Sequence, residues 1–414
     1  MKYNIALLHY SCPPVVGGVE EIVRQQASVF ARNYHNVKVL TGVGERFSES
    51  CELEINPLLG SQNRQVLNAQ KSALKDKPEK LAGLIKKLYK YLTLSLKDFD
   101  LLIAHNVLTM PFNLPLTGAL HRLGQEGVIP IISWNHDSPY FYADTPEYLD
   151  AFPWNILKRA YAGIHYVVIS ENRKKMFADL YGIGKHLDVI PNGIDPIAFF
   201  RLDPSSVHLI QEQRLFEAEL LMVQPTRLHP RKNVELSIRV TKAIRDMGIG
   251  VKMLITGAYD PHTPKTVDYL NKLKALIRDL DVENDVLIMA EHRFKSGEKL
   301  SVDRIIIRDL YLITDILFLP SLQEGFGIPL LEAGMIKLPV ACSNIPPFVE
   351  IGGQDVCIFD LYDPPEQIAR KIMAFIDGIK PHRMFRKVLR NYVWDNIYQD
   401  KILPLLTRVA KDHH

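Results

Sequence analysis

A loop that contains glycine and glutamate follows one of the most apolar runs of the chain. The run 315–320 predicts a buried parallel strand, and the segment after it, 321–334, reads SLQEGFGIPLLEAG. Gly325 and Gly327 allow the backbone to approach a ligand closely, and Pro329 suits the first turn of a helix. The free amides and the positive dipole end of such a helix favour a phosphate group.

The two glutamates of this segment suit hydroxyl groups. Glu324 lies in the loop, and Glu332 lies about one turn into the predicted helix, so we expect both to face the same crevice. Carboxylates accept hydrogen bonds from hydroxyls. Phosphate-binding amides and hydroxyl-binding carboxylates together indicate a sugar nucleotide. The alternative is a strand, a turn and a helix that carry two solvated glutamates.

The pair Glu324 and Glu332, eight positions apart with Gly-Phe-Gly between them, resembles a known motif. It is the donor-site motif of retaining GT-B glycosyltransferases, in the large family that contains sucrose synthase (glycosyltransferase family four). The resemblance implies two Rossmann-like, doubly wound parallel-sheet domains that face a central cleft. It also implies transfer of a hexose from a nucleotide diphosphate sugar to an acceptor hydroxyl with retention, without a cofactor or metal. A same-face displacement, in which the leaving phosphate helps to deprotonate the acceptor, is the mechanism implied.

The resemblance also assigns roles to the loop 226–233, which follows a predicted strand. Arg227 and Lys232 would hold the donor diphosphate, where the leaving group develops negative charge. Arg binds two oxygens at once, and Lys supplies a compact charge. Glu332 would bind the ribose and Glu324 the sugar. The implied donor-binding set in the second half is Arg227, Lys232, Glu324, Gly325, Phe326, Gly327 and Glu332. A solvated basic loop is the alternative for 226–233, and Arg231 fits it.

Further candidates lie in the first half of the chain. The Gly17-Gly18 pair opens a predicted helix, and its amides could contact the donor phosphates; an ordinary loop is the alternative. His136 ends a predicted strand, where the family keeps a histidine near the donor sugar, and a structural role is its alternative. His105 is a weaker candidate, and Asn192, in the linker signature, could reach the site. The catalytic set expected is His136, Glu324, Arg227 and Lys232.

Strands and helices alternate along the chain, which predicts two doubly wound parallel sheets. The expected domains are 1–200, an acceptor domain, and 201–394, a nucleotide-sugar donor domain, with a helix at about 395–414 that crosses back to the first domain. The predicted strands are Ile5–His9, Val37–Thr41, Leu101–His105, Ile129–Asn135, Tyr166–Ile169, Leu187–Ile190, Leu220–Gln224, Val251–Thr256, Val286–Met289, Ile316–Leu319, Val340–Cys342 and Cys357–Phe359.

Composition fits an enzyme with two cores. The chain has 414 residues, 47% of them hydrophobic, and a net charge of +3, so nothing implies a nucleic-acid partner. Its four scattered cysteines match no zinc pattern and indicate buried, reduced thiols. We find no signal peptide and no apolar run of about 18 residues, and expect a cytoplasmic protein of carbohydrate biosynthesis.

Three surface segments have open interpretations. The helix Lys80–Lys97 is amphipathic and basic, so it is a candidate for peripheral contact with an anionic membrane; packing on the first sheet is the alternative. The polar stretch 292–303 fits a lid, a contact surface or decoration. The aromatic stretch 139–154 fits an acceptor pocket or simple core packing.

Two other functions stay open on the sequence alone. A nucleotide-sugar epimerase on the same architecture would bind the same donor without an acceptor, and a sugar-nucleotide sensor would bind it without turnover. The base, the hexose, the acceptor (a sugar, a small polyol or a lipid-linked molecule) and the oligomeric state are left undetermined by the sequence.

Overall fold

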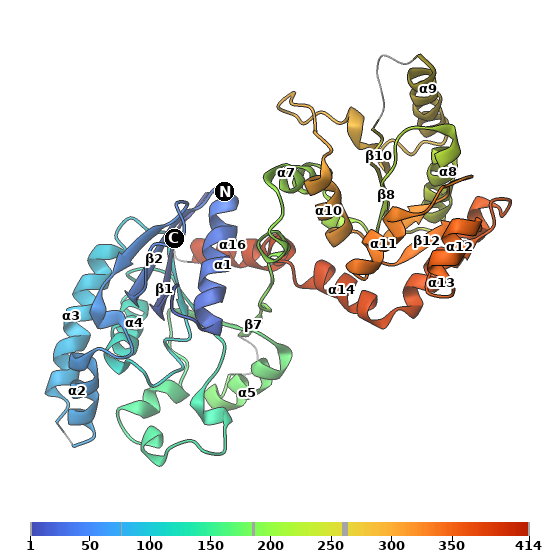
Figure 1. The fold of residues 1–414 in the computed structure, drawn as a ribbon. Helices are drawn as coiled ribbons and strands as arrows, with labels where there is room; N and C mark the ends of the chain where they lie inside the picture. The colour runs from blue at the N-terminus through green and yellow to red at the C-terminus, as the bar shows by residue number, and fades with distance from the viewer. Residues whose placement is uncertain (1, 76, 184–186, 259–263, 413–414) are drawn as a thin grey trace. The chain divides into compact units, whose positions relative to one another are not determined.

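The computed structural model describes residues 2–75, 77–183, 187–258 and 264–412. The chain forms two compact units (Figure 1). The first unit contains Met1–Asp195 together with the C-terminal segment Tyr392–His414, and the second contains Pro196–Asn391.

The first unit is built on a parallel sheet. Its described strands number seven, in the order β3-β2-β1-β4-β5-β6-β7. Their bounds are β1 (Asn4–Ser11), β2 (Asn36–Val43), β3 (Glu52–Ile55), β4 (Leu101–His105), β5 (Ile131–Asn135), β6 (Ile164–Val168) and β7 (Leu187–Val189). The helices of this unit are α1 (Gly18–Arg32), α2 (Arg64–Ala73), α3 (Glu79–Ser95), α4 (Leu114–Gln125), α5 (Glu171–Tyr181), α15 (Trp394–Ile397) and α16 (Leu403–Asp412), with a π-helix at Tyr398–Ile402.

Two apolar layers cover this sheet. Helices α1 and α16 pack on one face, and α3, α4 and α5 pack on the other. Each strand supplies apolar side chains to both layers, because its alternate residues point to opposite faces of the sheet. The C-terminal segment is tied in through Trp394, which is fully buried. A Cβ on Gly193 would lie 2.7 Å from the Trp394 ring, so only glycine at position 193 leaves room for this ring.

The second unit repeats the architecture. Within the described residues it has six parallel strands, in the order β10-β9-β8-β11-β12-β13. Their bounds are β8 (Leu220–Gln224), β9 (Val251–Ile255), β10 (Val286–Ile288), β11 (Ile316–Leu319), β12 (Val340–Ser343) and β13 (Cys357–Phe359). The helices are α6 (Pro196–Phe200), α7 (Pro204–Gln213), α8 (Val234–Asp246), α9 (Pro264–Asp279), α10 (Arg304–Ile313), α11 (Ile328–Met335), α12 (Pro346–Gly352), α13 (Pro365–Gly378) and α14 (Lys380–Asn391).

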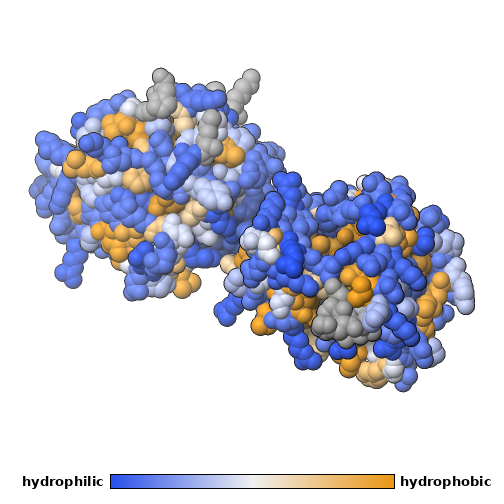
Figure 2. Space-filling view, turned by 90° about the horizontal axis from the view of Figure 1, so that it is seen from above, coloured by the Kyte–Doolittle hydropathy of each residue, from blue (hydrophilic) through white to orange (hydrophobic). Residues whose placement is uncertain are grey.

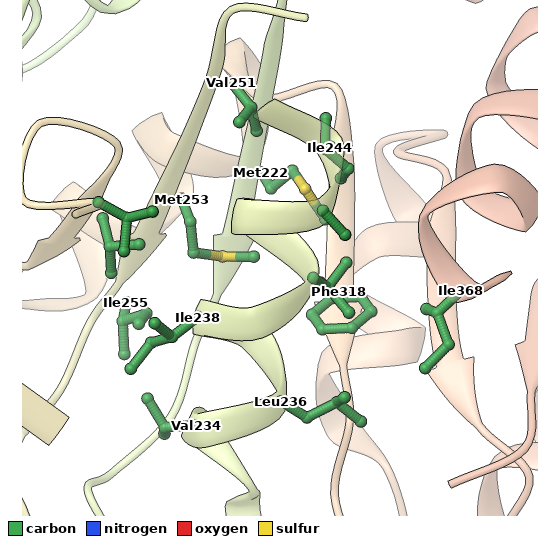
Figure 3. Packing of buried hydrophobic residues seen from close by; sticks show 14 of the residues in the cluster. Met222, Val234, Leu236, Ile238, Ile244, Val251, Met253, Ile255, Phe318 and Ile368 are labelled. Atoms are coloured by element: carbon green, nitrogen blue, oxygen red, sulfur yellow. The ribbon is translucent and has the colours of Figure 1, made fainter. Parts of the chain in front are cut away.

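The core of the second unit also has two layers. Helices α8, α9 and α13 cover one face of the sheet, where Ile238 of α8 lies beside Ile255 of β9 in a cluster that also contains Met253 and Phe318 (Figure 3). Helices α7, α10, α11 and α12 cover the other face. The strand order reverses at β8/β11, as it does at β1/β4 in the first unit. In open sheets of this kind, ligands bind at the carboxyl ends of the strands beside such a reversal.

The fold prediction is confirmed: both sheets are parallel and doubly wound, and each of the twelve predicted strands is present. The sequence analysis missed β3, an edge strand of four residues. Its side chains alternate between glutamate and aliphatic residues, and Lys38 of β2 forms ion pairs with Glu52 and Glu54 (3.2 Å each). An edge strand needs little apolar sequence, because only one neighbour and one face bury it.

The amphipathic helix α3 uses its apolar face inside the protein. Leu81, Leu88 and Leu92 are buried, and the latter two lie in the layer that α3 shares with α4. This face is therefore not free to enter a lipid surface, and packing on the first sheet, the alternative, is what the structure has. Lys86 and Lys87 point to solvent. No helix of the described residues has the length and hydropathy needed to cross a membrane.

The other two open segments are anchored by their apolar residues. In 292–303, Phe294 and Leu300 are buried, and Phe294 stacks on His208 of α7 with ring centroids 4.1 Å apart. In 139–154, Trp154 is buried in a small apolar cluster, whereas Phe152 is 65% exposed. On the surface in Figure 2, apolar residues are scattered among hydrophilic ones.

Candidate functional site

A cavity of about 960 Å³ opens in the second unit beside the carboxyl ends of β8 and β9. Its wall combines residues from the loop after β8, from α10 and from α11. Arg227 comes from the loop, Tyr311 from α10, and Glu332 and Met335 from α11. The size falls in the range of sites that bind drug-sized ligands.

Buried hydrogen bonds fix the loop that carries the predicted cations. The amide of Gln224, at the end of β8, donates from Nε2 to the carbonyl oxygen of Lys232 (2.9 Å). Ser237 Oγ donates to Gln224 Oε1 (2.7 Å), and both side chains are buried. At the start of the loop, the backbone N–H of Thr226 donates to Thr256 Oγ1 (2.7 Å). The backbone under Lys232 and Arg227 is therefore held from both strands β8 and β9.

The glycine-containing loop meets α11 in a conformation that needs glycine. Gly327 caps the helix with φ +139°, a region that other residues rarely adopt, and a Cβ there would lie 3.2 Å from Ile351 Cδ1. Gly325 has open space where a Cβ would stand. Its predicted role, close approach to a ligand, is consistent with this space. The backbone N–H of Leu322 donates to the carbonyl oxygen of Arg231 (2.8 Å), which joins this loop to the cationic loop.

Lys232 and Glu324, predicted as separate donor ligands, form an ion pair. The Lys232 ammonium donates to Glu324 Oε1, which also accepts a hydrogen bond from Ser321 Oγ (2.8 Å). Their side chains are 20% and 15% exposed. The lysine therefore stands partly neutralised in the free protein.

Glu332 and Arg227 are differently placed. The Tyr311 hydroxyl donates to Glu332 Oε2 (3.0 Å), which links α10 to α11. Burial, and next the nearby carboxylate of Glu332, raise the pKa of the Tyr311 hydroxyl. Arg227 is exposed, and both Arg227 and Glu332 line the cavity. The structure thus brings the Arg227 cation and the Glu332 carboxylate together on one cavity wall. The Lys232–Glu324 ion pair lies in the loops that carry Arg227 and lead into α11.

In the first unit, three buried histidines gather at the carboxyl ends of β1, β4 and β5. His136 Nε2 lies 3.3 Å from His105 Nδ1, and His9 Nδ1 donates to the carbonyl oxygen of His105 (2.8 Å). Asn192 Nδ2 lies 3.4 Å from His136 Nδ1, so these two residues, each predicted for the site, lie together. Burial, and next the charge of His9, lower the pKa of His136 to about 3. Burial also lowers the pKa of His9 and, further, that of His105.

The Gly17-Gly18 loop lies beside a carboxylate. Glu20 Oε1 accepts a hydrogen bond from Ser11 Oγ (2.6 Å) and lies 3.7 Å from His9 Nε2. A Cβ on Gly17 would lie 2.1 Å from Glu20 Oε2, whereas nothing lies within 4 Å of a Cβ on Gly18. A side chain at position 17 would therefore displace the Glu20 carboxylate from this place. Of this pair, Gly18 is the residue whose surroundings leave room for a ligand.

The sequence analysis did not single out His9, Ser11 and Glu20, which the structure places beside His105 and Gly17. A usable signal was present, because His9 and Ser11 end the first strand and Glu20 opens the helix after it. The positions of His136, Asn192, Gly17 and Gly18 all belong to the first unit. Among the residues that the structure describes, no group of three or more His, Cys, Asp or Glu side chains is arranged to hold a metal ion.

Comparison with known proteins identifies the family. The family profile described as Glycosyltransferase Family 4 matches residues 16–197, and the profile described as Glycosyl transferases group 1 matches residues 208–391. The chain therefore belongs to glycosyltransferase family 4, whose members have the GT-B fold. It is a glycosyltransferase that takes its sugar from a nucleotide sugar.

Individual relatives are distant. Mannosylglucosylglycerate synthase of Petrotoga mobilis is 26% identical over 269 residues, which is 60% of each chain. The protein of the same name from Thermotoga maritima is 23% identical over 364 residues, 81% of this chain and 79% of that one. Among solved structures, Anabaena Alr3699/HepE in complex with UDP and glucose is 18% identical over 99% of each chain, with a TM-score of 0.34.

Proposed function

We propose that the protein transfers a hexose from a nucleotide diphosphate sugar to an acceptor hydroxyl with retention of configuration. One observation carries the proposal: Arg227 and Glu332 share the wall of a cavity at the carboxyl ends of the second sheet, beside the Lys232–Glu324 pair. In this proposal the domain 201–394 binds the donor, and the domain 1–200, with the segment 395–414, binds the acceptor.

The donor diphosphate would lie at the N-terminus of α11. In its first turn the backbone N–H of Ile328 has no acceptor within the helix, whereas Pro329 has no N–H and that of Leu330 donates to the carbonyl oxygen of Gly327 (2.9 Å). The positive end of the helix dipole also favours negative charge there. Arg227 and Lys232 would add the positive charge that the departing nucleoside diphosphate needs. Lysine has three N–H donors, so Lys232 can retain Glu324 while it contacts a phosphate oxygen.

The two carboxylates would hold different parts of the donor. Glu332 lies on the cavity wall and would accept hydrogen bonds from the ribose hydroxyls. Glu324 would accept a hydrogen bond from a hydroxyl of the transferred sugar and would stabilise the positive charge that this sugar develops as its bond to phosphate breaks.

His136 would act as a neutral hydrogen-bonding group beside the sugar. A pKa of about 3 means that the imidazole carries no charge near pH 7, so one ring nitrogen donates and the other accepts. In the free protein Nε2 lies 3.3 Å from His105 Nδ1, and the sugar would replace this contact. Asn192 would orient the ring through Nδ1. The amide of Gly18 would complete the first unit's contribution. In a front-side displacement, the leaving phosphate oxygen takes the proton from the acceptor hydroxyl.

The reaction is tested by incubating a nucleotide sugar with and without acceptors and following both sugar and nucleotide. Mannosyl transfer to glucosylglycerate is the first reaction to test, because two relatives are named mannosylglucosylglycerate synthase. An acceptor-dependent product with the donor's anomeric configuration, read by proton NMR, supports the proposal. A new sugar epimer from the donor alone would indicate an epimerase instead. Nucleotide binding without turnover on sugar, polyol and lipid-linked acceptors would indicate a sensor.

A further inference from the structure

The inner face of α10 lines the donor cavity with a row of four side chains. Ile307, Arg308 and Tyr311 lie three, four and seven positions after Arg304, so all four are on one side of the helix. Ile328, Met335 and Ile336, which come from α11 and the residue after it, line the same cavity. The cavity wall therefore combines apolar side chains from both helices with the polar groups of α10.

Two of the three polar groups in this row are already engaged. Arg308 donates to the Asp309 carboxylate from Nε (2.9 Å) and lies 3.5 Å from the carbonyl oxygen of Arg201. The Tyr311 hydroxyl is bonded to Glu332. Within the described part of the chain, the Arg304 side chain forms no hydrogen bond or ion pair, although it is exposed on the cavity wall.

Arg304 does not serve the stability of its own helix. It is the first residue of α10, where the positive end of the helix dipole disfavours a cation. The helix is capped instead by Asp303, whose Oδ1 accepts from the backbone N–H groups of Ile305 and Ile306 (2.9 Å each). A cation at this position therefore has a cost in the free protein, and a ligand in the cavity can offset it.

The proposed donor sets which part of the ligand reaches Arg304. This step rests on the proposed function, in which Glu332 holds the ribose and Arg227 the diphosphate. The base would then lie in the same cavity, among the side chains of α10 and α11 that line it. Apolar side chains such as Ile307 and Met335 suit the faces of a base, and Arg304, which lines the same cavity, would contact an edge of it.

We infer that Arg304 selects guanine, so that the donor is a GDP-sugar. A guanidinium presents two parallel N–H donors, and guanine places two acceptors, O6 and N7, side by side on one edge. Adenine has an N6 donor beside N7, which opposes the arginine. Uracil presents only single carbonyl acceptors on separate parts of its ring.

Isothermal titration calorimetry with GDP, UDP and ADP tests the inference without knowledge of the acceptor. Wild-type protein is expected to bind GDP most tightly. Arg304→Ala should weaken the binding of GDP by roughly 5- to 150-fold and should change the affinities for UDP and ADP by less than about threefold. Arg304→Lys should also lose most of the preference for GDP over UDP and ADP. Lysine keeps the positive charge but lacks the two parallel N–H donors of the guanidinium. Arg370→Ala is the matched control, since Arg370 is exposed on α13 outside the cavity and should change none of the three.

Tighter binding of UDP or ADP than of GDP by wild-type protein would overturn the inference and leave the proposed function intact. An equal loss for all three nucleotides in Arg304→Ala, with the thermal midpoint unchanged, would also overturn it, because the arginine would then contact phosphate. Binding of none of the three would reject the proposed function itself, and the choice of guanine with it.

Discussion

Removing one charge from the Lys232–Glu324 pair should change nucleotide affinity in opposite directions. In the free protein the carboxylate partly neutralises the lysine. Glu324→Gln leaves the ammonium without its counter-charge, so a nucleoside diphosphate should bind more tightly. Lys232→Met removes the cation and leaves a carboxylate near the phosphates, so binding should weaken.

The burial of the Lys232–Glu324 pair sets the expected size of these changes in nucleotide affinity. With side chains 20% and 15% exposed, it lies between exposed ion pairs, worth about 0–1 kcal/mol, and fully buried ones, where loss of one partner costs about 3–5 kcal/mol. We expect Glu324→Gln to tighten the binding of GDP or UDP by about 1 kcal/mol, or roughly fivefold in Kd. Lys232→Met should lose a charged hydrogen bond, about 1.5–3 kcal/mol, or roughly 10- to 150-fold.

Calorimetric titration of each variant with GDP and with UDP measures these changes, and initial rates complete the test. Despite its tighter binding, Glu324→Gln should have a lower kcat, since its charge acts on the reacting sugar. Glu332→Gln should mainly raise KM for the donor. Glu366→Gln, an exposed change on α13, is the control. Weaker nucleotide binding in both Glu324→Gln and Lys232→Met would refute the neutralisation argument, and normal kinetics in all variants would reject the donor site.

Three further predictions concern stability, the first unit and metal dependence. Burial lowers the pKa of His121 to about 3 from 6.5, so between these values the unfolded chain binds more protons and stability falls as pH falls below 6.5. His121→Gln should therefore flatten the decline of the thermal midpoint between pH 7 and 5; an unchanged slope contradicts this. Gly17→Ala should displace Glu20 and lower activity even if the donor still binds, whereas Gly18→Ala should leave the thermal midpoint unchanged, so any loss of turnover in it reports a ligand contact. Exhaustive chelation should leave turnover intact, because the cationic loop supplies the positive charge; loss restored by magnesium or manganese would contradict that role.

The sequence determined the fold because periodicity is a local property. Buried parallel strands appear as short apolar runs, and each of the twelve predicted runs became a strand, with β4, β8, β11 and β13 matching to the residue. The edge strand β3 was missed because a strand with one neighbour carries little of that apolar signal. The same locality identified Gly327, since a turn into a helix at φ +139° needs glycine whatever lies around it.

Only the tertiary structure decided which side chains meet. Lys232 and Glu324 are 92 positions apart, and the sequence gives each a role but not their pairing. The cluster of His9, His105 and His136 exists because parallel strands end at the same edge of a sheet, and its lowered pKa values follow from a burial that no single segment specifies. Gly17 was predicted for its amide, and only the fold shows that a side chain there would displace the Glu20 carboxylate. Residue types are fixed by the chain, whereas distance, desolvation and charge pairing depend on segments far apart that folding brings together.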